Sequence, residues 1–329
     1  MYDVITIGAA TYDVFLQSRD FSVVEAGQYL VGRAECVPLG AKIEVRNITF
    51  STGGGATNAA VSFSRKGFKT AALVKVGTDA PGREVVAELA REGVATSLIQ
   101  ETHHRHTGYS VLMVTVSGER SVLVYRGASA HLTAHDIPWD RFESKWLYIS
   151  SLGGNLEILE TILGHTDPKR IKVAWNPGSQ ELHHGLNALV NILKRVDVLI
   201  LNQEEAALLT GIDFKDTTRM LSVLRHVTGG IILLTRGAEG ALVLEGKYLY
   251  NAGIFPEKVR MDRTGAGDAF GSGFVAGLML DGGVKEGLRV ASANATSNIE
   301  IIGAKTGLLT LRQLNDKRWR KLPIERRMM

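Results

Sequence analysis

The sequence predicts an α/β protein whose main sheet is mostly parallel, has helices on both faces and carries a small β element outside it. From residue 146 onward, strand-like and helix-like patterns alternate, which is typical of a parallel sheet covered by helices. Glycine accounts for 36 of the 329 residues, roughly 11 % against the usual ~7 %, and suits many tight strand–helix turns. The predicted strands cover 146–149, 171–175, 196–201, 231–235 and 241–245, and the predicted helices cover about 155–165, 185–194, 204–210 and 216–227.

The first half of the chain adds further strands and helices and the predicted small β element. Residues 3–8 (DVITIG) read as a buried strand, and residues 70–76 and 82–92 as a strand followed by an amphipathic helix. Residues 109–116 and 121–125 flank Ser117-Gly118-Glu119, which is a strong hairpin signal. Residues 17–50 are polar and irregular, with a β-prone piece at 42–50, and we expect them to join the hairpin outside the main sheet.

Composition excludes several classes of protein. The net charge of +4 comes from the C-terminal tail, because from Arg312 onward seven basic residues face two acidic ones, which leaves the rest of the chain near −1. This pattern is typical of a solvated end and argues against nucleic-acid binding. The single Cys36 suits a reducing compartment, the N-terminus lacks a basic signal-peptide region, and no apolar run approaches ~20 residues. We therefore expect a cytoplasmic protein with no membrane contact.

The most informative stretch is Asp262-Arg263-Thr264-Gly265-Ala266-Gly267-Asp268, which leads into the apolar segment 270–280 (FGSGFVAGLML). The small residues Gly265, Ala266 and Gly267 leave backbone N–H groups free to bind an anion at a helix N-terminus. A carboxylate there, on Asp268, suits a base that accepts a proton from a hydroxyl while the amides hold a transferred phosphoryl group. The alternative is a plain strand-to-helix turn with Asp268 facing the helix dipole.

A second glycine cluster, Gly53-Gly54-Gly55, precedes Asn58 at another predicted helix start. Glycines allow a ligand to approach the backbone closely, and the Asn58 amide can both donate and accept hydrogen bonds. A flexible hinge or a helix cap is the alternative interpretation. Asp13 follows the first strand and is either an acid that holds a ligand or an ordinary loop residue.

Further polar clusters fall where predicted strands end, which is where ligands collect in parallel sheets. Asn202 and Glu205, three residues apart at a helix start, suit a hydrated Mg²⁺ ion but also match a capping box. Thr235 and Gly237 offer a hydroxyl and N–H groups for phosphate oxygens, or form an ordinary turn. The agreement among several strand ends is stronger than any single cluster.

Other readings fit less well. His103, His104 and His106 lack metal-site spacing and are better explained as a solvated loop near the ligand. The phosphate-loop pattern G-x-x-x-x-G-K-[ST] and the hydrolase pattern G-x-S-x-G do not occur. The dinucleotide pattern nearly fits at Gly265 and Gly267, but its third glycine, Gly271, comes one residue late.

Together these motifs closely resemble the ribokinase-like (PfkB) family of carbohydrate and nucleoside kinases, over essentially the whole chain. The resemblance implies one domain over residues 1–329, an α/β/α sandwich with a mostly parallel sheet, and a small β-sheet lid formed by insertions at about 14–50 and 103–128. It also implies ATP-dependent phosphorylation of a hydroxyl, with Mg²⁺ and in many members a monovalent cation such as K⁺.

The resemblance assigns roles to individual residues. Asp268 would be the catalytic base, and Gly265, Ala266 and Gly267 the anion hole. The implied substrate contacts are Asp13, Gly54, Gly55, Asn58, Tyr109 and Arg126. The implied ATP contacts are Asn202, Thr235, Arg236, Gly237, Gly240, Gly265, Gly267 and Asn294, the last beside the adenine. Glu205 and Asn202 would support Mg²⁺ through water, and Asp262, Thr264 and Gly303 are candidates for the monovalent cation.

The substrate is less clear, because Arg263 and the long segment before Thr52 depart from the family pattern. We expect a kinase for a primary hydroxyl of a pentose or hexose. A nucleoside kinase is the alternative, with an aromatic shelf drawn from Tyr12, Phe15, Tyr109 or Tyr125. A phosphosugar kinase would use Arg105 and Arg126, and a sugar-acid kinase Arg126. A non-catalytic sensor is the remote alternative, and pairing of exposed lid edges would give a homodimer.

Overall fold

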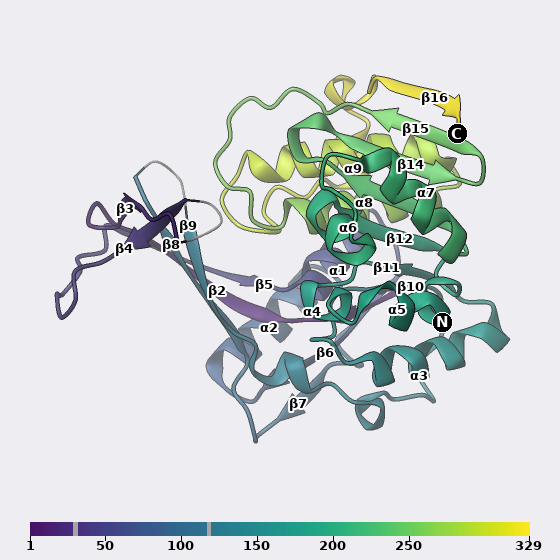
Figure 1. Ribbon diagram of the computed structural model, residues 1–329. Coiled ribbons are helices and arrows are strands. Elements are labelled where there is room, and N and C mark those ends of the chain that lie inside the picture. Colours follow the sequence, from purple (N-terminus) through teal and green to yellow (C-terminus); the bar gives the residue numbers. More distant parts are fainter. Residues whose placement is uncertain (29–31, 117–119) are drawn as a thin grey trace.

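The computed structural model describes residues 1–28, 32–116 and 120–329 (Figure 1). Within them, ten strands form one sheet in the order β16-β15-β14-β13-β12-β11-β10-β1-β6-β7. The pairs from β7 to β13 are parallel, and the pairs from β13 to β16 are antiparallel. These strands are β1 (Tyr2–Gly8), β6 (Thr70–Gly77), β7 (Gln100–Thr102), β10 (Ser144–Ile149), β11 (Lys172–Trp175), β12 (Val198–Asn202), β13 (Ile231–Thr235), β14 (Ala241–Glu245), β15 (Tyr248–Ala252) and β16 (Ile324–Met328).

Helices cover both faces of this sheet, so the predicted three-layer architecture is confirmed. Alternate residues of β1 enter opposite cores: Ile5 and Ile7 pack on one side and Val4 on the other. The first layer contains α3 (Leu156–Thr166), α5 (Gly185–Leu193), α6 (Gln203–Thr210) and α7 (Thr217–Val227). The second contains α1 (Gly55–Arg65), α2 (Ala80–Arg91), α8 (Ala266–Met279) and α9 (Gly283–Ile299), and α4 (Ser179–Leu182) and α10 (Leu311–Leu314) are single turns.

A separate four-stranded sheet, the lid, projects from one side of the main body (Figure 1). Its order is β5 (Asn47–Gly53), β2 (Thr11–Gln17), β8 (Gly108–Val114) and β9 (Arg120–Tyr125). Strands β3 (Ser22–Glu25) and β4 (Arg33–Cys36) form a separate two-stranded antiparallel sheet. The predicted turn Ser117-Gly118-Glu119 lies outside the described residues.

Three sequence-based expectations need correction. Residues 11–13, expected in a loop at the main sheet, belong to lid strand β2, because they pair with β5 and β8. The segment 17–50, expected to be irregular apart from a β-prone piece at 42–50, also contains β3 and β4; its expected place beside the hairpin, outside the main sheet, is confirmed by β5. The tail is only partly a solvated end: Leu314 and Trp319 pack in a small core with Phe255, and β16 pairs with β15.

Helix α8 begins at Ala266, four residues before the apolar segment that indicated it. Gly265 is the N-cap residue and has a φ of 72°, which glycine adopts without strain. None of the helices in the described part of the chain combines the length and apolar character that a membrane crossing requires.

Candidate active site

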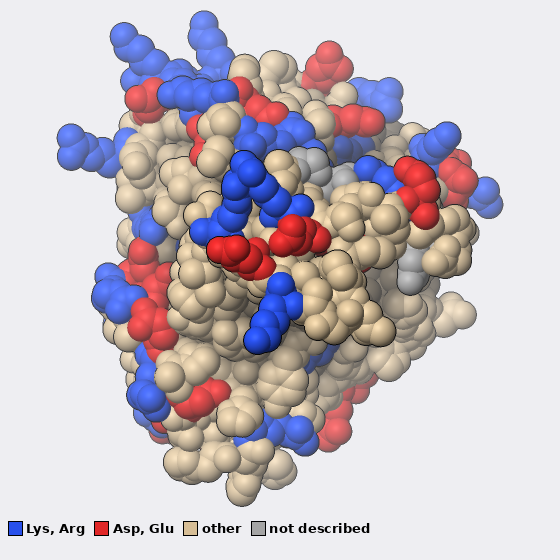
Figure 2. All heavy atoms as spheres, turned by 90° about the vertical axis from the view of Figure 1, so that its left-hand side faces the viewer, with Lys and Arg blue, Asp and Glu red and all other residues tan. Residues whose placement is uncertain are grey.

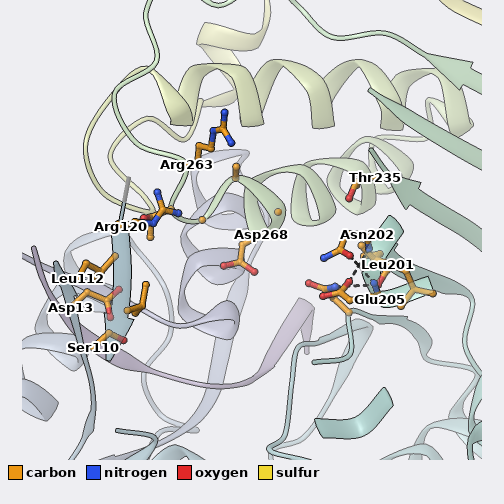
Figure 3. A pocket seen from close by; sticks show the side chains of 17 residues that line it. Asp13, Ser110, Leu112, Arg120, Leu201, Asn202, Glu205, Thr235, Arg263 and Asp268 are labelled. Atoms are coloured by element: carbon orange, nitrogen blue, oxygen red, sulfur yellow. Dashed lines mark hydrogen bonds between the residues drawn. The ribbon is translucent and has the colours of Figure 1, made fainter. Parts of the chain in front are cut away.

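Two adjoining cavities lie where the lid, the carboxyl ends of the parallel strands and the start of α8 meet. One has a volume of about 360 Å³ and the other about 300 Å³. They share four lining residues, Thr235, Arg263, Ala266 and Gly267. We call the first the acceptor cavity, because it holds Asp13 and Asp268, and the second the nucleotide cavity. Figure 3 shows the acceptor cavity with Asp268 between the lid residues and Asn202.

The turn before α8 is shaped by close packing that only glycine permits. A Cβ atom on Gly265 would lie 2.7 Å from the Cβ of Ala304, so a side chain there would displace the 303–305 loop. A Cβ on Gly267 would meet no atom within 4 Å, which leaves its backbone open to the cavities. The first N–H groups of a helix have no intrahelical acceptor. The N-terminus of α8 therefore opens onto the junction of the two cavities, where the sequence predicts an anion-binding site.

Asp268 stands in the first turn of α8 and is held by a distant residue. The Nδ2 of Asn58, at the start of α1, donates a hydrogen bond to Oδ2 of Asp268 over 2.8 Å. Burial raises the pKa of Asp268 above the usual aspartate value; the hydrogen bond from Asn58 opposes this rise, the charge of Asp13 adds to it, and the positive charge of Lys305 opposes it. A buried carboxylate with a raised pKa is suited to act as a general base.

The acceptor side brings Asp13 and the glycine cluster together. Asp13 is 6 % exposed, and its Oδ1 accepts a hydrogen bond from Thr11. A Cβ on Gly53 would lie 2.0 Å from Oδ2 of Asp13, so only glycine allows β5 to pass this close. Burial raises the pKa of Asp13 as well. Gly54 has a φ of 101°, and a Cβ on Gly55 would lie 3.4 Å from Oδ1 of Asp268, so the cluster brings the backbone up to both acids.

Asn58 is the clearest sign of a ligand on this side. The residue is 4 % exposed, and its Oδ1 has no hydrogen-bond partner among the described residues, while its Nδ2 is bonded to Asp268. Burying an unpaired amide oxygen costs free energy unless a ligand or water supplies a donor. A ligand hydroxyl beside Asn58 would supply that donor.

Asn202 and Glu205 form the capping box that the sequence left as an alternative. The Asn202 side chain accepts from the N–H of Glu205, and the Glu205 carboxylate accepts from the N–H of Asn202, both over 2.8 Å. Both residues also line the acceptor cavity. Burial raises the pKa of Glu205; the Asn202 hydrogen bond opposes the rise, and the charge of Asp268 adds to it. Capping uses the only side-chain oxygen of Asn202 and one of the two carboxylate oxygens of Glu205, so the second Glu205 oxygen is left for a hydrated cation.

The nucleotide cavity is largely apolar. Of the predicted ATP contacts, Thr235, Gly237, Gly240 and Gly267 line it. A Cβ on Gly237 would meet nothing within 4 Å, so this turn is open to a ligand. Sequence reasoning missed the apolar lining residues, because nothing in a single sequence marks them as a surface: Ala238, Ile254, Phe255, Phe270, Ala295 and Ile299.

Seven predicted contacts line neither cavity: Gly54, Gly55, Asn58, Tyr109, Arg126, Arg236 and Asn294. Asn294 is fully buried and bonds Ala269, Ser62, Lys66 and Leu309 instead, because it lies on the side of α9 that faces α1. The Arg236 guanidinium bonds Asn251 and Glu239.

The lid explains why Tyr109 and Arg126 were misplaced. Tyr109 pairs with Tyr12 across β2 and β8, and their rings lie 5.7 Å apart. The next pair, Asp13 and Ser110, points to the other face of the sheet and lines the acceptor cavity, because strand side chains alternate. The lid arginine at the cavity is Arg120, whose Nη1 lies 3.2 Å from Oδ1 of Asp262. Figure 3 shows Arg120 on the lid side of Asp268.

The cation candidates have partners of their own. Asp262 accepts hydrogen bonds from Thr264 and from the N–H of Gly303, in addition to its ion pair with Arg120. Beside them, the fully buried Asn298 donates to the carbonyl of Thr264, and its Oδ1 has no partner in the described part of the chain. The described residues contain no group of three or more His, Cys, Asp or Glu side chains placed to hold a metal ion, the histidines at 103–106 included.

Comparison with known proteins identifies the class. Residues 5–311 match the profile of the pfkB family carbohydrate kinases, and the chain belongs to this family. It is 26 % identical over 271 residues to the ribokinase of Haemophilus influenzae, covering 80 % of this chain and 86 % of that protein.

Solved structures agree on the fold. The structure of Arabidopsis thaliana ribokinase complexed with ribose and ATP superposes with a TM-score of 0.80 and 18 % identity, covering 97 % of this chain and 99 % of that one. The adenosine kinase from Sinorhizobium meliloti gives a TM-score of 0.78 and 24 % identity, covering 94 % and 97 %. The chain is thus an ATP-dependent phosphotransferase that acts on a hydroxyl group, as the motifs predicted.

Proposed function

We propose that this protein is a sugar kinase that transfers the γ-phosphoryl group of ATP to a hydroxyl of a pentose or hexose. The observation that carries the proposal is Asn58: its buried Oδ1 has no partner among the described residues, and its Nδ2 donates to the carboxylate of Asp268. One substrate hydroxyl could donate to Oδ1 of Asn58, and a neighbouring hydroxyl, the phosphoryl acceptor, could give its proton to Asp268. Asp13 and the Gly53-Gly54-Gly55 backbone supply further groups for neighbouring hydroxyls.

The proposed reaction runs across the junction of the two cavities. Asp268 accepts the proton of the acceptor hydroxyl, whose oxygen forms a bond to the γ-phosphorus. The bond between this phosphorus and the β,γ-bridging oxygen breaks, and ADP leaves with that oxygen. The N–H groups at the start of α8, beside Gly265 and Gly267, stabilise the negative charge on the transferred group. The products are a phosphorylated sugar, ADP and a proton.

Two cations fit the proposed reaction. Glu205 and Asn202 would hold a hydrated Mg²⁺, which when bound neutralises phosphate charge. For K⁺, the unpartnered Oδ1 of Asn298 and the adjacent carbonyl of Thr264 supply neutral oxygens of the right kind. We expect the rate to vanish in the presence of a chelator and to rise on addition of K⁺.

An uncharged acceptor is favoured over a phosphosugar or a sugar acid. A phosphosugar or a sugar acid would need an unpaired cation on the lid to bind its negative charge. The lid arginine at the acceptor cavity is Arg120, and it is paired with Asp262. A nucleoside is the second candidate, because Leu112 and Val122 form an apolar lid wall against which a base could pack. The aromatic shelf expected for a base is not formed at the described cavities, since none of Tyr12, Phe15, Tyr109 and Tyr125 lines either of them.

A homodimer through the lid is part of the proposal. Ile48, Phe50, Leu123 and Tyr125 of the lid edge strands are between 48 % and 58 % exposed. Figure 2 views the side of the molecule on which the lid lies, and uncharged residues cover much of that face. Exposed apolar patches and open edge strands favour association with a second copy. Light scattering over a range of concentrations would test this, and a monomer throughout would refute it.

The deciding experiment measures ATP turnover with Mg²⁺ and K⁺ on a panel of sugars, phosphosugars, sugar acids and nucleosides. The Asp268→Asn variant is the control. One pentose or hexose that is phosphorylated by the parent and not by the control would establish the proposed function. A nucleoside as the preferred acceptor would replace it with the second candidate. ATP binding with no turnover on any acceptor would favour a sensor.

A further inference from the structure

The loop after α9 contains a buried lysine, Lys305, that takes no part in the proposed phosphoryl transfer. Lys305 is 3 % exposed. Its ammonium bonds the hydroxyl of Thr52 on lid strand β5 and lies 2.6 Å from Oε2 of Glu88 on α2. A buried ammonium is costly to maintain without partners, and these two come from elements of different parts of the fold. The ammonium therefore joins the base of the lid to the body.

The backbone of this loop is fixed independently of the ammonium. The guanidinium of Arg65, at the end of α1, donates to the carbonyls of Lys305 over 2.9 Å and of Leu308 over 2.8 Å. Arg65 is itself held by a bidentate pair with Glu92. Because the loop is anchored in this way, the Lys305 side chain is pre-organised rather than free to swing.

The same loop touches both halves of the candidate active site. Ala304 packs against Gly265 at the anion-binding turn, and Lys305 bonds Thr52, the residue before Gly53, which lies against Asp13. Among the described residues, the charge of Lys305 opposes the rise in pKa that burial causes at both Asp13 and Asp268. The other groups that act on these acids are neutral or negative: Asn58 and Asp13 act on Asp268, and Thr11, Ser110 and Asp262 act on Asp13.

We propose that Lys305 is a positioning residue of the acceptor site: its buried ammonium clamps β5 to α2 and is the positive charge that Asp13 and Asp268 share. The inference rests on the proposed function, because it takes Asp268 as the base. Without the ammonium, both carboxylates would stay protonated to higher pH. The segment Thr52–Gly53, which lies against Asp13, would also lose its contact through Lys305 with Glu88 on α2.

The test compares the pH dependence of kcat/KM in Lys305→Met and in the parent. Removing the ammonium raises the pKa of Asp268, so the acid limb of the profile moves to higher pH. A shift of one pH unit lowers kcat/KM about tenfold on that limb and much less on the plateau. The KM of the acceptor should rise, while the Kd of ATP measured by calorimetry stays unchanged.

The matched control is Lys66→Met. Lys66 is also a fully buried lysine, but its partners are the neutral groups of Ser62, Asn294 and Leu309. Its loss should leave the acid limb in place even if stability falls. The double variant Lys305→Met with Glu88→Gln removes the unpaired carboxylate and serves where the single variant does not fold; its acid limb should move upward too.

The outcomes separate the two hypotheses. An acid limb that coincides in the parent, Lys66→Met and the folded Lys305 variant would overturn the role of Lys305, even when Asp268→Asn is inactive. Near-parental turnover by Asp268→Asn in the same assay would overturn the proposed function itself. A shift in the Lys305 variants alone, with Asp268→Asn inactive, supports both.

Discussion

The two cavities have similar volumes, but they are lined by different kinds of residue. The acceptor cavity contains Asp13, Glu205 and Asp268, all with pKa values raised by burial. It is supported by polar contacts between segments far apart in the chain, such as Asn58 with Asp268. The nucleotide cavity is lined mainly by small and apolar residues around two glycine turns. The cavity that holds the predicted base thus carries buried charge, and the predicted nucleotide cavity is mostly apolar.

The largest expected effect comes from Asp268→Asn, which removes the base and keeps the shape of the side chain. Turnover should fall by about 10²–10⁴-fold, the usual contribution of a general base. Nucleotide affinity should hardly change, because Asp268 does not line the nucleotide cavity. Steady-state kinetics and calorimetric titration with ATP would measure the two quantities. An equal loss of turnover and of ATP affinity would show that Asp268 acts on nucleotide binding as well as on proton transfer.

The reverse experiment targets the nucleotide side. Ala238 is exposed and lines the nucleotide cavity, so Ala238→Asp places a negative charge where an anionic ligand would bind. We expect the Kd of ATP to rise about tenfold, equivalent to about 1.4 kcal/mol, while the KM of the acceptor is unchanged. Ala238→Ser is the control for size. Equal effects of the two substitutions would mean that charge at this position is irrelevant.

A smaller effect on the KM of the acceptor is expected from the contact between the lid and the segment before α8. The ion pair between Arg120 and Asp262 is partly exposed on the arginine side, and such pairs contribute about 0–1 kcal/mol. Arg120→Ala should therefore raise the KM of the acceptor by a few-fold and leave the ATP side alone. Arg126→Ala, on the same lid but outside both cavities, should behave like the parent. If Arg126→Ala raises the KM of the acceptor more than Arg120→Ala does, then Arg126, and not Arg120, is the lid arginine at the acceptor cavity.

The smallest expected effect is on stability. Burial raises the folded-state pKa of Asp268, so the ionised side chain opposes folding, and its favourable contribution is present only below the ordinary aspartate pKa. That contribution is lost as the pH rises through the folded-state pKa. Asp268→Asn should consequently unfold at a higher temperature than the parent at pH 7, and the difference should shrink toward pH 4. Thermal unfolding by circular dichroism would show a constant difference if burial of this charge has no cost.

Residues close in sequence could be interpreted without the structure. The turn Gly265-Ala266-Gly267 before an apolar segment, the Gly53–Asn58 start of α1 and the Thr235–Gly240 turn each contain their own signal. The first and the last of these turns line the cavities, and the Gly53–Asn58 segment lies beside Asp13 and Asp268 without lining either cavity. The misplaced residues were those whose direction depends on packing. Asn294 turned toward Ser62 of α1, Arg236 toward Asn251, and Tyr109 toward the outer face of the lid.

By itself the sequence determined the alternating strands and helices, the signature turn at α8 and the class of reaction, because periodicity and glycine-dependent backbone geometry are local properties. Only the tertiary structure decided which residues complete the site. Asn58 meets Asp268 across 210 positions, Arg120 meets Asp262 across 142, and Lys305 meets Thr52 across 253. The physical reason is that hydrogen bonds and buried charges depend on distance in space and on exclusion of water, which the folded chain alone sets.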